Sequence, residues 1–277
     1  MLAAFVIVFR EVIEAGLIIG IVLAATRGLP QRGRWVGAGI AGGLAGAGIV
    51  AAFAREIAAA FVGSGQELFN AGVLLIAVTM LSWHNVWMAR HGKEMAHKMR
   101  RLGTEVATGR RPLTALAIVV GAAVLREGSE AVLFLAGVAA SDGGGAVVVG
   151  GVAGTAGAAA MSALLYLGLL TIPTHRLFAV TSGLVTLLAA GLASQAIAFL
   201  QQAGTIEVLT ATAWDTSWLL ADGSLAGRLL RTLVGYTATP TEAQLIAYLT
   251  TVTAILGLMR RVGGMAARDA APPGKGT

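Results

Sequence analysis

The sequence contains no cysteine and very little charge. Without cysteine the chain cannot form disulfides, thiolate metal sites or iron–sulfur clusters, and it has no cysteine nucleophile. Charged residues make up 12% of the 277 residues, whereas soluble domains carry about 25%. So few charges cannot cover a water-soluble protein of this size, and the mean hydropathy of +0.79 agrees. We therefore expect the chain to be solvated by lipid.

Apolar segments long enough to cross a bilayer fill most of the chain. A spanning helix needs about 20 mostly apolar residues. Seven segments qualify: 2–26, 35–54, 69–90, 113–140, 146–170, 176–201 and 243–261. The predicted fold is all-α, a polytopic membrane protein with seven transmembrane helices. We expect one transmembrane domain over 1–261, with an outer loop at 202–242, and a disordered cytoplasmic tail at 262–277.

Lysine and arginine are divided unequally between the two sides of this arrangement. With the N-terminus outside, fifteen lie on the inner side, and seven of these fall between Arg90 and Arg111. The outer side has three, Arg55, Arg228 and Arg231. Because cytoplasmic loops are enriched in basic residues, we predict the N-terminus outside and the C-terminus in the cytoplasm. The basic loop 91–109 has no interleaved aromatic residues, so we expect an anchor and no nucleic-acid partner.

One charged motif, Arg-Glu-x-x-Glu, occurs twice, each time in the middle of an apolar segment. It reads REVIE at 10–14 and REGSE at 126–130. No basic region precedes the first apolar run, which contains the first motif, so no cleavable signal peptide is expected. The segment after each motif is rich in glycine at spacings that let helices approach closely, such as Gly39/Gly43.

The two motifs and their glycine-rich neighbours predict an internal repeat. Repeat A covers 1–90 and repeat B covers 113–201, with the last helix at 243–261 added. Each repeat has three spans, so the second copy enters the membrane from the opposite side. This 3+3 inverted repeat is a common transporter architecture with its site near the midplane.

Six charged side chains in the middle of a membrane indicate a function. Each costs on the order of 2.5–3.5 kcal/mol when isolated. Four carboxylates and two guanidinium groups leave an excess of negative charge that a bound cation or protons would relieve. Oxygen ligands suit Mg, Ca, Mn and iron. The predicted ligands are Glu11, Glu14, Glu127 and Glu130. We expect Arg10 and Arg126 each to hold one glutamate in place by charge-assisted hydrogen bonds. A purely structural knot of ion pairs is less favoured because acids outnumber bases two to one.

Two copies of this motif in a seven-span chain resemble the oxidase-dependent iron transporters, the family of fungal high-affinity iron permeases and bacterial ferrous iron permeases. The resemblance covers most of the chain, including the segment from Trp214 to Thr237. It implies an iron permease of the inner (plasma) membrane, not an enzyme. The four glutamates would contact iron, which is the transported substrate, and no cofactor is permanently bound. An extracytoplasmic oxidase or iron-delivery protein is the expected partner besides the lipid bilayer.

Weaker candidates lie outside the motifs. His84, in the third span, is a possible auxiliary ligand, although histidine inside a membrane is more often a hydrogen-bonded packing residue. Trp35, Trp83 and Trp87 are expected to lie in the interfacial aromatic belt. Ser224 is expected to cap a short amphipathic helix in the outer loop.

Two other functions stay open. An intramembrane di-metal carboxylate enzyme also uses paired glutamates, but such bundles carry Glu-x-x-His on two helices, and both motifs here have glutamate at the fourth position of that spacing. A transporter of another cation or of protons is chemically equivalent, because carboxylates accept many hard cations. Only the family resemblance favours iron.

Overall fold

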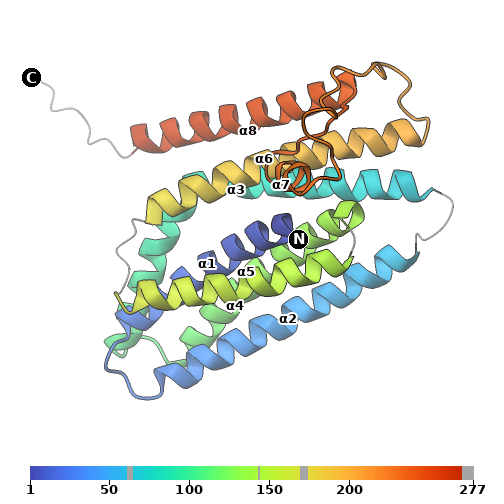
Figure 1. The fold of residues 1–277 in the computed structure, drawn as a ribbon. Helices are drawn as coiled ribbons and strands as arrows, with labels where there is room; N and C mark the ends of the chain where they lie inside the picture. Colours follow the sequence, from blue (N-terminus) through green and yellow to red (C-terminus); the bar gives the residue numbers. More distant parts are fainter. Residues whose placement is uncertain (61–64, 143, 169–173, 270–277) are drawn as a thin grey trace, which may run out of the picture.

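The computed structural model describes residues 1–60, 65–142, 144–168 and 174–269 (Figure 1). Eight α-helices form in these residues, and the only β-structure among them is an isolated bridge between Thr212 and Thr241. The helices are α1 (Leu2–Ala25), α2 (Arg32–Ala60), α3 (Gln66–Ala107), α4 (Thr114–Asp142), α5 (Gly144–Tyr166), α6 (Thr174–Gln202), α7 (Leu225–Val234) and α8 (Glu242–Asp269). The predicted all-α fold is confirmed for the described part of the chain.

Seven of these helices coincide with the seven apolar segments, and α7 lies in the outer loop. Five of the described helices are long and apolar enough to cross a membrane, namely α2, α3, α5, α6 and α8. Helices α1 and α4 are of similar length, but each has the three charged side chains of its motif near its middle. Because a charge in lipid is costly, α1 and α4 depend on neighbouring helices to cover those side chains.

The basic run after Arg90 is helical, which corrects the predicted loop. Helix α3 continues for 42 residues to Ala107. Lysine, arginine, glutamate and methionine favour helix, and the ion pair of Arg101 with Glu105, at 2.9 Å, joins adjacent turns. The hydrogen bond from Arg101 lowers the pKa of the Glu105 carboxyl. The end of α3 is held in the fold because Val106 packs in an apolar cluster with side chains of α1, α2 and α4.

The last helix is also longer than predicted. Helix α8 runs from Glu242 to Asp269, so the segment 262–269, expected in the disordered tail, is helical. This segment contains no proline and several good helix formers. The rest of the predicted tail, 270–277, lies outside the described residues.

The helices of the two predicted repeats pack crosswise. Helix α1 lies along α5, and α2 lies along α4, while α3 packs against α6 (Figure 1). Gly43 makes the α2–α4 contact close. A Cβ atom built there would lie 2.8 Å from the carbonyl oxygen of Gly121 and 2.9 Å from the backbone nitrogen of Leu125. The backbones of α2 and α4 therefore touch at this point.

The α1–α5 contact repeats this geometry. A Cβ atom on Gly154 would lie 2.7 Å from the carbonyl oxygen of Phe5 and 3.2 Å from the backbone nitrogen of Phe9. Phe5 and Phe9 precede the arginine of the first motif by five residues and one residue. Gly121 and Leu125 precede the arginine of the second motif by the same intervals. Each motif helix is thus in contact with the glycine-rich helix of the other half at an equivalent position.

Two apolar clusters lie on either side of the motifs. One includes Ile7, Leu81 and Phe134, which are fully buried. The other includes Val22 and Leu116, also fully buried. In both α1 and α4 the motif stands between these two clusters, so its charged side chains lie in the middle of the helix bundle.

The segment between α6 and α8, predicted to be the outer loop, is held by local hydrogen bonds. Ser224 caps α7 as predicted, because its Oγ accepts a hydrogen bond of 2.9 Å from a backbone N–H of the first turn. Asp215 accepts hydrogen bonds from Ser217, and Asp222 accepts one from the backbone N–H of Ala238. These two carboxylates therefore stabilise the fold of the segment itself.

The glycine contact predicts a difference between two neighbouring substitutions in α2. Gly43→Ala should destabilise the protein by about 1–3 kcal/mol, because the added methyl group meets backbone atoms that cannot move without separating α2 from α4. Gly42→Ala is the matched control, since a Cβ atom at Gly42 meets nothing within 4 Å. Thermal unfolding of the purified variants in detergent measures both effects. Equal unfolding temperatures for the two variants would contradict the close contact.

Candidate metal centre

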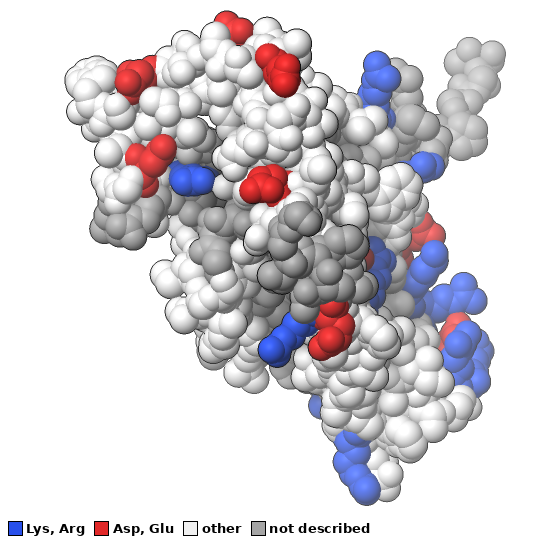
Figure 2. Space-filling view, turned by 90° about the vertical axis from the view of Figure 1, so that its right-hand side faces the viewer, with Lys and Arg blue, Asp and Glu red and all other residues white. Residues whose placement is uncertain are grey.

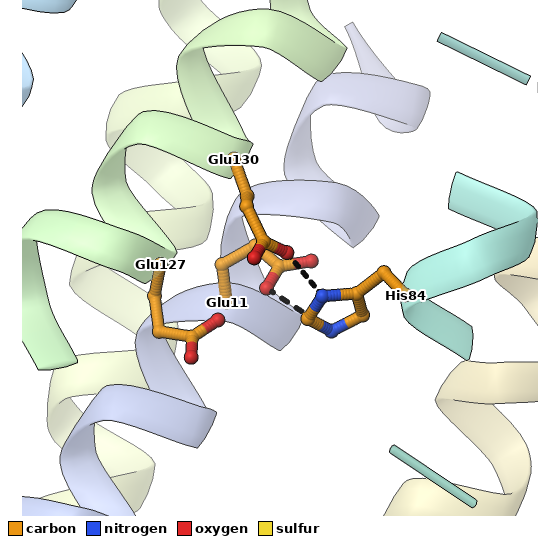
Figure 3. Close-up of side chains that lie close together, drawn as sticks. All are labelled: Glu11, His84, Glu127 and Glu130. Atoms are coloured by element: carbon orange, nitrogen blue, oxygen red, sulfur yellow. Dashed lines mark ion pairs between the residues drawn. The ribbon is translucent and has the colours of Figure 1, made fainter. Parts of the chain in front are cut away.

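The two motifs face each other where α1 packs on α4, and α3 closes a third side of this space (Figure 3). Helical spacing puts the two glutamates of each motif on one face. Glu11 and Glu14 enter from α1, and Glu127 and Glu130 enter from α4. His84 enters from α3 and is 3% exposed. All five side chains are buried except that of Glu130, which is 19% exposed.

Each arginine binds the second glutamate of its own motif. Arg10 donates from Nε to Glu14 Oε1 at 2.9 Å, and Arg126 donates from Nε to Glu130 Oε1 at 3.0 Å. Both pairs have the i,i+4 spacing that predicts them. In the second motif the first glutamate also lies near the arginine, with Glu127 Oε1 3.9 Å from Arg126 Nε.

Four side chains from three helices converge on one point. Glu11, His84, Glu127 and Glu130 each offer one ligand atom, and these atoms all lie within 4.8 Å of one another. Figure 3 shows the carboxylates of α1 and α4 directed toward the imidazole from α3. His84 Nδ1 contacts Glu130 Oε2, and His84 Nε2 lies 3.8 Å from Glu11 Oε2. Three carboxylate oxygens and one imidazole nitrogen form a ligand set that iron, manganese and related metals accept.

Glu14 is near this cluster but is not a member of it. Its Oε1 is bound by Arg10, and its Oε2 lies 3.4 Å from His84 Nε2. The structure therefore brings three of the four predicted ligands together with His84, and Glu14 lies beside them. The predicted auxiliary residue occupies a position equivalent to that of the main ligands.

Several buried oxygen atoms in the cluster lack a hydrogen-bond donor. Among the described residues, both Oε atoms of Glu11 and the Oε2 atom of Glu127 have no partner. Buried polar atoms are nearly always hydrogen-bonded, so each such atom needs an explanation. A cation at the centre of the cluster would supply the missing partner for all three oxygens, because carboxylates bind hard cations directly.

The residue next to His84 fixes this part of α3. Asn85 is 1% exposed, and its Nδ2 donates to the carbonyl oxygen of Ser182 at 3.1 Å and to Thr186 Oγ1 at 2.9 Å. Both acceptors belong to α6. The ring of His84 also meets Phe134 edge-on, with centroids 6.4 Å apart. These contacts hold the imidazole toward the carboxylates.

A cavity of about 1040 Å³ reaches the cluster from the side of the basic end of α3. Glu14 and Glu127 line the end of the cavity at the motifs, and Arg100 lines it near the basic end of α3. Most of its wall is apolar and comes from the halves of α1, α3, α4, α6 and α8 on that side. The cavity gives the buried carboxylates a direct connection to this end of the molecule.

The opposite side of the cluster is closed. Ile7, Leu81 and Phe134 are fully buried there in the apolar cluster of that side. A smaller cavity of about 140 Å³ lies farther out on that side, lined by Ala3 and Gln244 among others. In the described part of the chain, the large cavity opens the candidate centre toward the basic end of α3.

Trp87 lies on the wall of the large cavity. We expected it in the interfacial belt, but its indole covers Arg126, whose Cζ atom is 4.2 Å from the ring centroid. Trp83, one turn earlier, is 73% exposed on the outer surface of the helix bundle. The position of Trp87 is four residues before His91 and three after His84, so a helical wheel drawn around His84 would have identified the face of α3 that meets the motifs.

The end of the molecule that carries the closed side is displayed in Figure 2. Acidic groups are scattered over its upper half, whereas most of the basic groups in view lie toward the lower right. Exposed carboxylates at this end include Glu56, Glu67 and Glu207. An excess of acid at one end of the bundle attracts cations to that end.

Comparison with known proteins identifies the family. Residues 1–266 match the iron permease FTR1 family. Among curated relatives, the ferrous iron permease EfeU of Shigella sonnei is 31% identical over 277 residues, which cover 98% of this chain and 100% of the relative. The protein of the same name from Escherichia coli O6:H1 is 32% identical over 97% of this chain and 100% of the relative. The one from Yersinia pestis is 31% identical over 90% and 89%.

These relatives are named as permeases, which are transporters and not enzymes. No solved structure gives a significant match to the chain. The predicted family is confirmed over nearly the whole length of the chain, and several described helices are able to cross a membrane. The chain is therefore a multi-pass membrane protein that belongs to the iron permease FTR1 family.

Proposed function

We propose that this protein is an iron permease and that the transported ion binds between the two motifs, at Glu11, His84, Glu127 and Glu130. The observation that carries the proposal is the convergence of four ligand atoms within 4.8 Å, three of them from buried side chains. Two of the carboxylates in this cluster have oxygen atoms without donors. The ion supplies the positive charge that these groups lack. Membership of an iron permease family selects iron among the cations that such ligands accept.

The rival enzyme reading has less support. Di-metal carboxylate bundles carry Glu-x-x-His on two helices, and both motifs here have glutamate in place of that histidine. The named relatives are permeases. We therefore assign the cluster to a single transported ion and the chain to transport.

The arrangement of the chain in the membrane follows from the crosswise packing. We propose that α1 and α4 cross the bilayer together with the five strongly apolar helices, giving seven spans. The equivalent contacts of Gly43 and Gly154 support a 3+3 inverted repeat, because each motif helix meets the glycine-rich helix of the other half at the same interval from its arginine. The basic bias favours a cytoplasmic C-terminus and an inner-membrane location.

The large cavity then opens toward the cytoplasm, and the structure corresponds to an inward-open conformation. An ion leaving Glu127 enters a cavity that continues to Arg100, near the basic end of α3. On the outer side, Ile7 and Phe134 seal the cluster, so entry requires this seal to open. A seal on one side and a cavity on the other are the features of alternating access around a fixed site.

The outer segment 202–242 remains the proposed surface for an extracytoplasmic oxidase or iron-delivery protein. Trp218 and Leu219 on this segment are 81% and 69% exposed. Large exposed apolar groups mark sites of interaction with proteins or with lipid. Asp215 and Asp222 are engaged in local hydrogen bonds, so we place the expected contact on the apolar groups.

Loss of a ligand should abolish transport. Glu11→Gln, Glu127→Gln, Glu130→Gln and His84→Gln should each lower iron uptake into proteoliposomes by about tenfold or more, since glutamine keeps size but loses charge or basicity. Combining two of these changes should add little, because residues that act as one site are not additive. Glu56→Gln, at an exposed carboxylate, is the control and should transport normally. Wild-type uptake by all four single variants would refute the site.

The two arginines should differ in their effect on stability. Arg10→Gln leaves Glu14 buried without its partner, so we expect a loss of about 3–5 kcal/mol. Arg126 is 35% exposed on the cavity wall, so Arg126→Gln should cost less. The double variant Arg10→Gln with Glu14→Gln removes both charges and should recover much of the lost stability. Thermal unfolding in detergent measures all three, and equal losses for both arginines would contradict the difference in burial.

The absence of cysteine allows a direct test of the cavity and its orientation. A single cysteine at Ile18, which lines the cavity, should react with a membrane-impermeant maleimide in inside-out vesicles. The control is Ile7→Cys, in the fully buried seal, which should stay unreactive from that side. Labelling of Ile18→Cys from the outside alone would reverse the proposed topology.

A further inference from the structure

The two arginines of the repeated motif lie in different surroundings. Both arginines contact the large cavity, but the side chain of Arg10 is 1% exposed, whereas that of Arg126 is 35% exposed. Water that enters the cavity competes with Glu130 for the N–H groups of Arg126, and it screens the ion pair. The Arg10–Glu14 ion pair is protected from water by burial. The Arg126–Glu130 ion pair is partly exposed, so a further contact is needed to hold Arg126 in one orientation.

The indole of Trp87 supplies this means. The Cζ atom of Arg126 lies 4.2 Å from the centroid of the Trp87 ring, which is a cation–π distance. The same indole stacks on the imidazole of His91 with centroids 4.8 Å apart and an interplanar angle of 19°. His91 Nδ1 also lies 3.1 Å from the carbonyl oxygen of Trp87. The ring is thus held on α3 by a neighbour one turn away.

Two side chains of α3 restrain the two oxygens of the Glu130 carboxylate. His84 Nδ1 contacts Glu130 Oε2 directly. Arg126 donates to Glu130 Oε1 at 3.0 Å, and Trp87 covers that arginine. His84 and Trp87 are three residues apart and share one face of α3. One helix face therefore fixes Glu130 twice, once by contact and once through Arg126.

We propose that Trp87 is a positioning residue of the metal centre: by holding the guanidinium of Arg126 against its ring face, it fixes the orientation of Glu130 toward the bound ion. This inference rests on the proposed function only in taking Glu130 as a ligand. The two motifs are then unequal, because Arg10 is held by burial and Arg126 is held by the ring of Trp87.

Fluorinated tryptophans test the contact without changing its shape. Each added fluorine weakens the negative potential of the ring face, which attracts the cation. Placing mono-, di- and trifluorotryptophan at position 87 by nonsense suppression should raise the KM for iron stepwise, to a several-fold increase in the trifluoro protein. Trp87→Phe should retain most of the activity, and Trp87→Leu should lose it. A flat series at position 87 would overturn the proposal.

Two controls separate positioning from packing. The same series at Trp83, which is 73% exposed on the same helix, should leave the KM unchanged. In an Arg126→Gln background the fluorine series at position 87 should have no further effect on unfolding temperature, because the coupled partner is gone. A series that persists in that background would overturn the proposed route through Arg126.

Separate measurements test the proposed function and the Trp87–Arg126 contact. Absence of iron uptake by the wild-type protein would refute the permease function. The contact itself is then judged by unfolding temperature in detergent. A stepwise fall with fluorination at position 87, absent at position 83, supports the Trp87–Arg126 contact, and equal flat series overturn it.

Discussion

The fold depends on the cost of burying carboxylates in the middle of an apolar bundle. Two helices that carry three charges each are stable only if every charge meets a partner. The i,i+4 arginine forms an ion pair with the second glutamate within each helix. The first glutamate is buried without such an i,i+4 partner in its own helix. Glu11 and Glu127 share one buried space between α1, α4 and α3, where their like charges repel each other. A bound cation or protons would offset this repulsion.

Close helix contacts make that meeting possible. Glycine at positions 43 and 154 lets each motif helix touch the helix of the other half backbone to backbone, so that the two motifs come to lie in the middle of the bundle. The symmetry of these contacts does not extend to the cluster. Helix α3 contributes His84 and Trp87, and its aromatic and imidazole groups act on the second motif. The side chains that α3 adds to the cluster therefore contact the two motifs unequally.

Much of this architecture was predictable from the sequence. Hydropathy located all seven long helices, and the repeated motif identified the paired arginines and three of the four side chains in the cluster. The end of α3 was missed because a basic, polar helix has the composition of a loop, and its helicity depends on ion pairs and on packing by Val106. His84 was predicted only as an auxiliary ligand, because its place beside the motifs depends on how α3 approaches them. Trp87 was expected in the interfacial belt, although its spacing from His84 puts both residues on one face of α3.

The width of the inner cavity has a consequence for hydration. Liquid water occupies about 30 Å³ per molecule, so a cavity of about 1040 Å³ holds many more molecules than one hydration shell. An ion that leaves the cluster on this side regains its water at once, next to the carboxylates. On the sealed side, Ile7 and Phe134 leave no such room. Under the proposed function, dehydration of the ion is therefore concentrated on the sealed side, before the ion reaches the carboxylates.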